Sequence, residues 1–254
     1  MEKITTAVNT FRAKYNALPG DMDTATAAQL GFAARAGTRG LGDGNSIIEG
    51  YSAGFGGGPG YYGQGESIMF WSDLTYANGM NINLIEGNYS AASFTSMAPL
   101  PIPTTQIGLY FPAAKIGNGS FIYVDSDYIS GKGNYYDLQS NLGIGSSVPA
   151  GRLTGGGYSL SVNQAYYIDR KIDDCMPQFG RVLAQFGPSG CWSNPVNIPG
   201  YVQNCVSQVP YTIAISGDAT TCFDNGNTAG ANQGYSVSQN NGNGVNCVLT
   251  FEFQ

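Results

Sequence analysis

The chain has 254 residues, enough for one large domain or two small ones with a hydrophobic core, and only 11% of them are charged. Its net charge of −6, without a polybasic run, argues against nucleic acid or anionic membrane surfaces as partners. The absence of histidine excludes Ser-His-Asp and Cys-His catalysis and histidine-ligated zinc, and no window approaches the ~20 apolar residues of a membrane span. The 37 glycines and 17 tyrosines are typical of an extracellular, β-rich protein with long loops.

Residues 1–18 are predicted to form an amphipathic helix. Apolar side chains recur at spacings of four, three, four and three, which places them on one helix face: Ile4, Val8, Phe11, Tyr15 and Leu18. Pro19-Gly20 ends this helix, because proline disfavours helical geometry in the residue before it. Either Asp21 or Asp23 is then expected to cap a short second helix through Thr24–Leu30.

The rest of the chain is predicted to combine two further helices with several strands. Residues 36–65 are rich in glycine, whereas 66–77 and 161–172 have the apolar spacing of helices, the latter with Ala165, Ile168 and Ile172 on one face. Runs of β-branched and aromatic residues predict strands at 107–111, 120–124, 181–186, 211–215, 234–237 and 247–253. This order predicts one α+β domain over 1–254, made of the helix 1–18, a helix and loop region 19–105 and a β-rich region 106–254.

Five cysteines lie late in the chain, at positions 175, 191, 205, 222 and 247. Their irregular spacing lacks CxxC pairs, which favours disulfides in an oxidising compartment over a metal knuckle. An exported protein needs an export signal, yet the start MEKITTAVNTF has no apolar signal-peptide region. We therefore expect that an N-terminal segment has been removed.

Five segments, in order along the chain, carry a family resemblance. They are Phe11-Arg-Ala-Lys-Tyr-Asn-Ala-Leu-Pro-Gly-Asp21, Gly42-Asp43-Gly44, Glu66-Ser-Ile-Met-Phe-Trp71-Ser-Asp-Leu74, Ala165–Asp174 with Pro177 and Gly180-Arg-Val, and Cys222 with the terminal CVLTFEF. Together they resemble the soluble part of bacterial type IV pilin-like proteins, which include type IV pilins and the pseudopilins of type II secretion. The chain departs from that pattern at Cys175, where the family has glycine, and at 186–218, which has the character of an insertion.

The resemblance implies a pilin-like fold, in which an N-terminal helix packs on an antiparallel sheet with long glycine-rich loops and a disulfide-bonded C-terminal region. It implies a non-enzymatic structural subunit of a type IV pilus or type II secretion pseudopilus, held in the inner membrane by a missing N-terminal segment before it enters a periplasmic or extracellular filament. Its partners would be copies of itself or other pilin-like subunits. The face formed by Ile4, Val8, Phe11 and Tyr15 would belong to the filament helix.

The resemblance also bears on the cysteines. It pairs Cys222 with Cys247, a bridge that would clamp the last strand. Among the other three, Cys191 and Cys205 are nearest in sequence and form the next expected pair. Cys175 is left without an assigned partner.

Ile168–Gly180 (IDRKIDDCMPQFG) concentrates charge in a chain that is otherwise poor in it. An active site here would use Asp169 and Asp173 as acid and base and Cys175 as nucleophile. However, Asp169 and Asp173 are four residues apart and are expected to share an exposed helix face beside two cations that keep them ionised. Asp173 and Asp174 also oppose the helix dipole at a C-terminus, which favours a turn whose carboxylates bind backbone amides. We therefore expect a structural helix end rather than a catalytic site.

Two further parts of the sequence suggest binding sites. Asp43, Asn45 and Glu49 are weak calcium candidates, because Arg39 and Leu41 occupy positions where an EF-hand loop needs oxygen ligands; a glycine turn without a cofactor is favoured. The alternative function is an extracellular adhesin or glycan-binding module that uses exposed tyrosines, for which the candidates are Tyr61, Tyr62, Tyr135 and Tyr136. Phe70 and Trp71 have helical spacing and are expected in the core.

Overall fold

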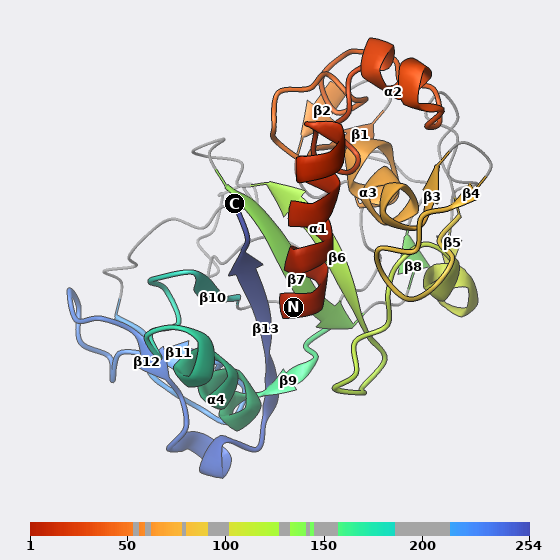
Figure 1. The fold of residues 1–254 in the computed structure, drawn as a ribbon. Helices are drawn as coiled ribbons and strands as arrows, with labels where there is room; N and C mark the ends of the chain where they lie inside the picture. The colour runs from red at the N-terminus through yellow and green to blue at the C-terminus, as the bar shows by residue number, and fades with distance from the viewer. Residues whose placement is uncertain are drawn as a thin grey trace.

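The computed structural model describes residues 1–52, 56–58, 62–77, 80–90, 102–126, 133–140, 143–144, 157–185 and 214–254. They form a mixed fold of helix and sheet, in which a curled antiparallel sheet is crossed on one face by the N-terminal helix (Figure 1). Among these residues, no helix combines the length and the apolarity needed to cross a membrane.

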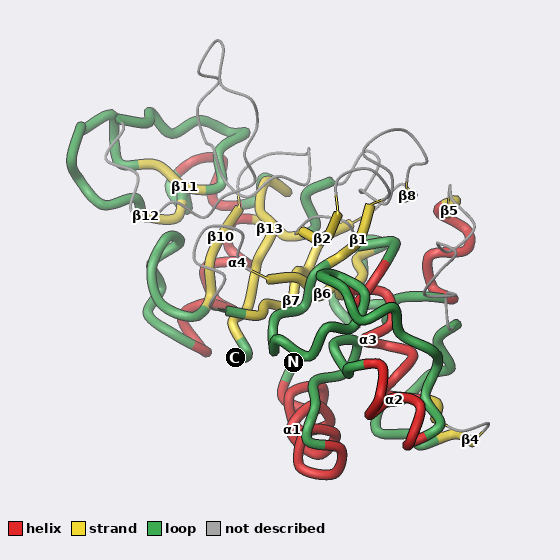
Figure 2. Tube along the Cα trace, turned by 90° about the horizontal axis from the view of Figure 1, so that it is seen from above, coloured by secondary structure: helices red, strands yellow, loops and turns green. Residues whose placement is uncertain are grey.

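Helix α1 (Glu2–Tyr15) follows the predicted apolar spacing, but the predicted end at residue 18 is wrong, because Asn16 adopts a left-handed φ of 52° and ends the helix before Pro19. Val8 and Phe11 are buried, and Ile4 and Tyr15 are partly buried against the core. Figures 1 and 2 show the helix lying over the sheet from two directions. The predicted apolar face is therefore the face that packs on the domain itself.

Helix α2 (Thr24–Leu30) begins after Asp23, whose carboxylate accepts hydrogen bonds from the N–H groups of Ala25 and Thr26. This confirms the second of the two predicted caps. Helix α3 (Gly65–Thr75) is buried along its whole length, and Phe70 and Trp71 are in the core as expected. The last two residues of the predicted helix instead form strand β3 (Tyr76–Ala77), which pairs with β4 (Met80–Asn81).

The main sheet is antiparallel and has the strand order β10 (Val182–Gln185), β13 (Val245–Glu252), β7 (Asn134–Ser140) and β6 (Ser120–Ser126), with β9 (Leu160–Ser161) paired to the start of β13. Successive side chains of a strand face opposite sides of a sheet. On one side, the ring of Tyr136 contacts those of Phe70 and Trp71; on the other, Tyr123 contacts Tyr62 and Phe111. Aromatic side chains therefore cover both faces.

Three short antiparallel ladders and two 3₁₀ turns complete the described chain. The ladders are β1 (Gly50–Ser52) with β2 (Gly56–Gly58), β5 (Ile102–Pro103) with β8 (Gly143–Ile144), and β11 (Phe223–Asp224) with β12 (Gly234–Tyr235). The 3₁₀ turns are η1 (Thr104–Leu109) and η2 (Gln239–Gly242).

Most predicted strands are present, but one is wrong. Residues 107–111 fall in and after η1 rather than in a strand. Ile107 and Phe111 are both buried. Their separation of four residues fits one turn of a helix, whereas the composition of the segment fits a strand. The strands predicted at 120–124, 181–186, 234–237 and 247–253 overlap β6, β10, β12 and β13. Of the strand predicted at 211–215, residues 211–213 lie outside the described chain and 214–215 form no strand.

Helix α4 (Val162–Ile172) begins with a reciprocal capping box, in which Ser161 and Gln164 each accept the other's backbone N–H. Its buried positions are Val162, Ala165 and Asp169, whereas Ile172 is 55% exposed. The predicted apolar face is therefore wrong at its last position. A carboxylate, rather than the isoleucine, faces inward at the end of this helix.

Candidate functional site

The turn after α1 joins three parts of the chain. Gly20 has a left-handed φ of +85°, and its N–H donates to Oδ2 of Asp73 on α3 at 2.7 Å. A Cβ on Gly20 would collide with the carbonyl oxygen of Glu66, so the turn requires glycine for space as well as for conformation. Arg35 donates to the same Oδ2 atom at 2.5 Å from the segment after α2.

Two buried carboxylates bind backbone N–H groups of the loop 42–49. Oδ1 and Oδ2 of Asp21 accept the N–H groups of Gly44 at 2.9 Å and Ser46 at 2.6 Å. Oε1 and Oε2 of Glu66, in the first turn of α3, accept the N–H groups of Gly42 and Glu49, both at 2.8 Å. The loop therefore takes its shape from carboxylates that lie before and after it in the sequence.

Asp43 joins these two groups to form a carboxylate cluster. One oxygen atom each from Asp21, Asp43 and Glu66 lie within 4.8 Å of one another. Burial raises the pKa of Asp21 to about 7, and the backbone N–H groups of Ser46 and Gly44 oppose that shift. Burial also raises the pKa of Glu66 well above its usual value, with Asp21 adding to the shift. Oxygen atoms at this spacing are a ligand set that a hard cation such as Ca²⁺ accepts.

Only two of the three predicted calcium ligands lie together in the structure. Asp43 and Asn45 lie together, because Oδ1 and Oδ2 of Asp43 accept the backbone and side-chain N–H groups of Asn45. Glu49 instead binds the guanidinium of Arg39 through both carboxylate oxygens. The neighbours of Asp43 are Asp21 and Glu66, which were not predicted as ligands. Both residues lie in family-like segments of a chain that has few carboxylates, and this was the feature of the sequence that could have indicated them.

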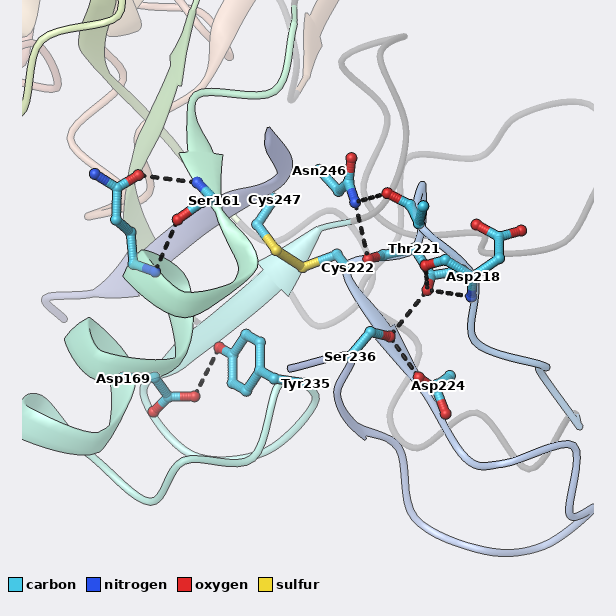
Figure 3. Close-up of a disulfide and its surroundings, with 12 residues drawn as sticks. Ser161, Asp169, Asp218, Thr221, Cys222, Asp224, Tyr235, Ser236, Asn246 and Cys247 are labelled. Atoms are coloured by element: carbon cyan, nitrogen blue, oxygen red, sulfur yellow. Dashed lines mark hydrogen bonds between the residues drawn. A yellow bond between two sulfur atoms is a disulfide. The ribbon is translucent and has the colours of Figure 1, made fainter. Parts of the chain in front are cut away.

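The end of α4 also differs from the expectation of an exposed face. Asp169 is fully buried; its Oδ1 accepts the N–H of Cys175 at 3.2 Å and its Oδ2 accepts the hydroxyl of Tyr235 at 2.8 Å (Figure 3). Burial raises the pKa of Asp169 to about 6, and the hydrogen bond from Tyr235 opposes the shift. The predicted exposure of Asp169 is therefore wrong, because a tyrosine from β12 draws this carboxylate inward.

The neighbouring aspartates bind the backbone of the following turn. Oδ2 of Asp173 accepts the N–H groups of Arg181 and Val182, and Asp174 accepts that of Met176. Cys175 is half-buried, has a left-handed φ of 65° and forms no disulfide within the described residues. Asp173 and Asp174 therefore form the carboxylate-rich turn that the sequence predicts, because their carboxylates accept backbone N–H groups of the residues that follow.

The predicted bridge between Cys222 and Cys247 is confirmed, and it joins the β11–β12 region to the last strand (Figure 3). Nδ2 of Asn246 donates to the carbonyl oxygens of Ala219 and Thr221 beside the bridge. The disulfide and Asn246 therefore attach the same loop to β13. Cys191 and Cys205, the other expected pair, lie outside the described residues.

The tyrosine candidates are mostly internal. Tyr62 and Tyr136 are each 1% exposed, so the prediction that they offer an exposed platform is wrong. Tyr135 is half-buried, and Tyr61 lies outside the described residues. Tyr62 instead donates its hydroxyl to Oδ2 of Asp137 at 2.7 Å.

Asp137 is a further buried carboxylate that the sequence analysis missed. Its Oδ1 accepts the hydroxyl of Thr250 at 2.9 Å, so it links β7 to β13 and to the segment before α3. Burial raises the pKa of Asp137 to about 7, and the Tyr62 and Thr250 hydroxyls oppose the shift. Asp137 lies in β7 (NYYDLQS), which has no regular alternation of apolar and polar residues, so no sequence pattern predicts that this carboxylate is buried.

The carboxylates described above are thus engaged by backbone N–H groups, hydroxyls or guanidinium groups of the same domain. Chemically they act as fixed acceptors that shape turns and join elements. Comparison of the chain with protein-family models, with curated proteins and with solved structures found no match. A functional assignment therefore depends on the sequence motifs and on the arrangement of the elements.

Proposed function

We propose that this chain is the globular part of a non-enzymatic structural subunit of a bacterial type IV filament, either a type IV pilus or a type II secretion pseudopilus. The subunit passes from the inner membrane into a periplasmic or extracellular filament, where it contacts copies of itself or other pilin-like subunits. The observation that carries the proposal is the arrangement of α1. Its apolar face packs on its own domain, while Thr6, Asn9 and Ala13 on the other side are exposed.

An N-terminal helix docked in this way suits a filament subunit for a physical reason. Subunits of a helical polymer meet through heterologous contacts, which propagate instead of closing into a ring. A helix that already uses one face inside its own domain can offer the other face to a neighbouring subunit without unfolding. The exposed centre of α1 carries small, uncharged side chains, which allow close approach: Thr6, Asn9, Thr10 and Ala13.

The positions of the family-like segments support the same proposal. Gly20 and Asp21 connect α1 to α3 and to the loop 42–49. Asp169 and Asp173 shape the end of α4, and the Cys222–Cys247 bridge holds the last strand. The residues that carry the resemblance thus connect helices, loops and strands of the domain. This role favours an architecture shared with pilin-like proteins over a chance likeness of short motifs.

The proposal is tested with the full-length protein in its host. The gene is deleted and restored as wild type, as Ala13→Glu on the exposed side of α1, or as Ala28→Glu on the exposed side of α2. Both variants introduce the same charge at an exposed alanine of a helix, so similar thermal stability is expected. Filaments are examined by negative-stain electron microscopy with gold-labelled antibody against this domain.

We expect labelled filaments with the wild type and with Ala28→Glu, and a strong reduction with Ala13→Glu and in the deletion strain. A charge at position 13 places a carboxylate in the proposed interface between subunits, where it must lose its hydration. Filaments, secretion and DNA uptake that are all unchanged by the deletion would contradict the proposal, as would filaments that never bind the antibody.

A further inference from the structure

Two segments of the described chain match the Asn-X-Ser/Thr acceptor pattern of N-linked glycosylation. They are Asn88-Tyr89-Ser90, preceded by Glu86-Gly87, and Asn118-Gly119-Ser120. The pattern has a functional meaning only where the asparagine and the hydroxyl two residues later are both accessible to a transferase, normally in a surface loop. The structure distinguishes the two segments on this criterion.

Asn88 and Ser90 are both exposed, in a stretch from 82 to 90 that forms neither helix nor strand. The residue between them faces the protein: Tyr89 is partly buried against the core, with its ring centroid 6.4 Å from that of Trp71. The Tyr89 hydroxyl donates to the carbonyl oxygen of Glu86 at 3.3 Å. The backbone N–H of Ser90 donates to the carbonyl oxygen of Leu109 at 2.8 Å. Tyr89 therefore anchors the turn while the asparagine and serine side chains remain at the surface.

The second segment has the same pattern but not the same access. Ser120 is the first residue of β6 and is 2% exposed, so its hydroxyl cannot contact a transferase while the domain is folded. The side-chain nitrogen of Asn118 donates to the carbonyl oxygen of Ser159 at 3.1 Å. The nitrogen that would have to be modified is thus already bound within the domain. Asn118 serves as an internal control.

We propose that Asn88 is an N-glycosylation site, with Ser90 as the required hydroxyl residue. The donor is an oligosaccharide joined through its anomeric carbon to a lipid-linked diphosphate. The Asn88 side-chain nitrogen forms a bond to that carbon and loses a proton, while the carbon–oxygen bond to the diphosphate breaks and the lipid diphosphate leaves with the electron pair. The proposal does not depend on the filament assignment. It requires only that the chain enters an oxidising compartment outside the cytosol, which the Cys222–Cys247 disulfide favours.

The test is mass spectrometry of the full-length protein isolated from its natural host. Tryptic cleavage places Asn88 on the peptide that ends at Lys115 and Asn118 on the peptide that ends at Lys132, so the two segments are read separately. The variants are Asn88→Gln, Ser90→Ala and Ser90→Thr, with Asn118→Gln as the matched control. Thermal unfolding of each variant checks that the domain is intact, as expected for substitutions at exposed positions 88 and 90.

We expect a glycan mass on the Asn88 peptide of the wild type, its loss in Asn88→Gln and Ser90→Ala, and its retention in Ser90→Thr and Asn118→Gln. The retention in Ser90→Thr is expected because threonine keeps the hydroxyl that the pattern requires. An unmodified Asn88 peptide from the natural host would overturn the proposal. A glycan mass that persists in Asn88→Gln, or that lies on the Asn118 peptide, would overturn it as well.

Discussion

Arg35 and Asp73 form an ion pair in the interior of the domain, with side chains that are 0% and 2% exposed. Nη2 of Arg35 lies 2.5 Å from Oδ2 of Asp73, and the same oxygen accepts the N–H of Gly20 at 2.7 Å. One carboxylate on α3 therefore holds both the turn after α1 and the segment after α2. The two partners are separated by 38 residues in the sequence, and nothing in their local patterns pairs them.

Substitution of Arg35 by methionine is expected to destabilise the domain strongly. Arg35→Met leaves the Asp73 carboxylate buried without its cation, and such a change costs about 3–5 kcal/mol. Urea unfolding measures the loss. Lys3→Met is the matched control, because Lys3 pairs with Glu86 at 3.8 Å in an exposed position where an ion pair contributes little. Equal stability of the two variants would contradict the role of the buried pair.

Gly20→Ala is expected to cost more than Gly117→Ala. Both glycines have left-handed φ values, +85° and +83°, so both variants carry the penalty of about 1–2 kcal/mol for placing an L-residue there. Only Gly20 is crowded by the Glu66 carbonyl, whereas nothing lies within 4 Å of a Cβ at Gly117. Forced overpacking adds about 1–3 kcal/mol at Gly20, which the difference in unfolding free energy between the variants measures. Equal losses would show that the close approach to Glu66 carries no penalty.

Removal of the Cys222–Cys247 bridge is expected to reduce stability by about 3 kcal/mol, because the cross-link limits the freedom of the unfolded chain. The bridge joins residues 25 positions apart and lies in the core, where both cysteines are 0% exposed. Denaturant unfolding of the double variant Cys222→Ala/Cys247→Ala measures the change. Hydrogen exchange of the double variant should also show weaker protection of β11 and β12 than of β6 and β7. A loss below about 1 kcal/mol would contradict this role for the bridge.

Cys175→Gly is expected to stabilise the domain relative to Cys175→Ala. Cys175 has a φ of 65°, in the region where glycine is favoured and other L-residues are strained. Both variants remove the thiol, so their difference isolates the backbone conformation. Glycine avoids the penalty of the left-handed conformation but loses more conformational entropy on folding than alanine does. The net expectation is a free energy of unfolding that is higher by about 1 kcal/mol for the glycine variant. Unfolding free energies that favour alanine would contradict the strained conformation.

Asp137 is expected to make the domain less stable as the pH rises from about 4 to about 7. Burial raises its pKa from 3.8 to about 7, so over this interval the folded protein binds a proton that the unfolded chain has released. The free energy of unfolding then falls with rising pH and levels off above the folded pKa. Asp21 and Asp169, whose pKa values are raised to about 7 and about 6, contribute in the same direction.

The measurement is urea unfolding of Asp137→Asn at several pH values across that interval. The variant removes the titrating group and keeps a side chain of the same shape, so a slope smaller by up to about one proton is expected. Asp218→Asn is the control, because Asp218 is exposed and hydrogen bonds from Thr220 lower its pKa. Its effect is confined to lower pH. An unchanged slope in Asp137→Asn would contradict the shifted titration of Asp137.

Local sequence patterns predicted the helices well, because a helix depends on spacing and capping within a few residues. The apolar spacing of α1, the Asp23 cap of α2 and the Ser161 start of α4 can all be seen in short windows of sequence. The error at 107–111 has the same origin. Composition suggested a strand, but Ile107 and Phe111 are also one helical turn apart, and the window contains nothing that decides between the two.

The sequence by itself thus predicted helices α1 to α4, strands β6, β10, β12 and β13, the aromatic core around Phe70 and Trp71, and, through the family-like pattern, the partner of Cys222. Only the tertiary structure decided where the carboxylates lie. Asp169 is buried because Tyr235, 66 residues away, supplies a hydroxyl, and Glu66 is bound by the N–H groups of a loop that lies earlier in the chain. A charged side chain becomes buried only where distant donors converge on it, and that convergence is a property of the folded chain rather than of any local pattern.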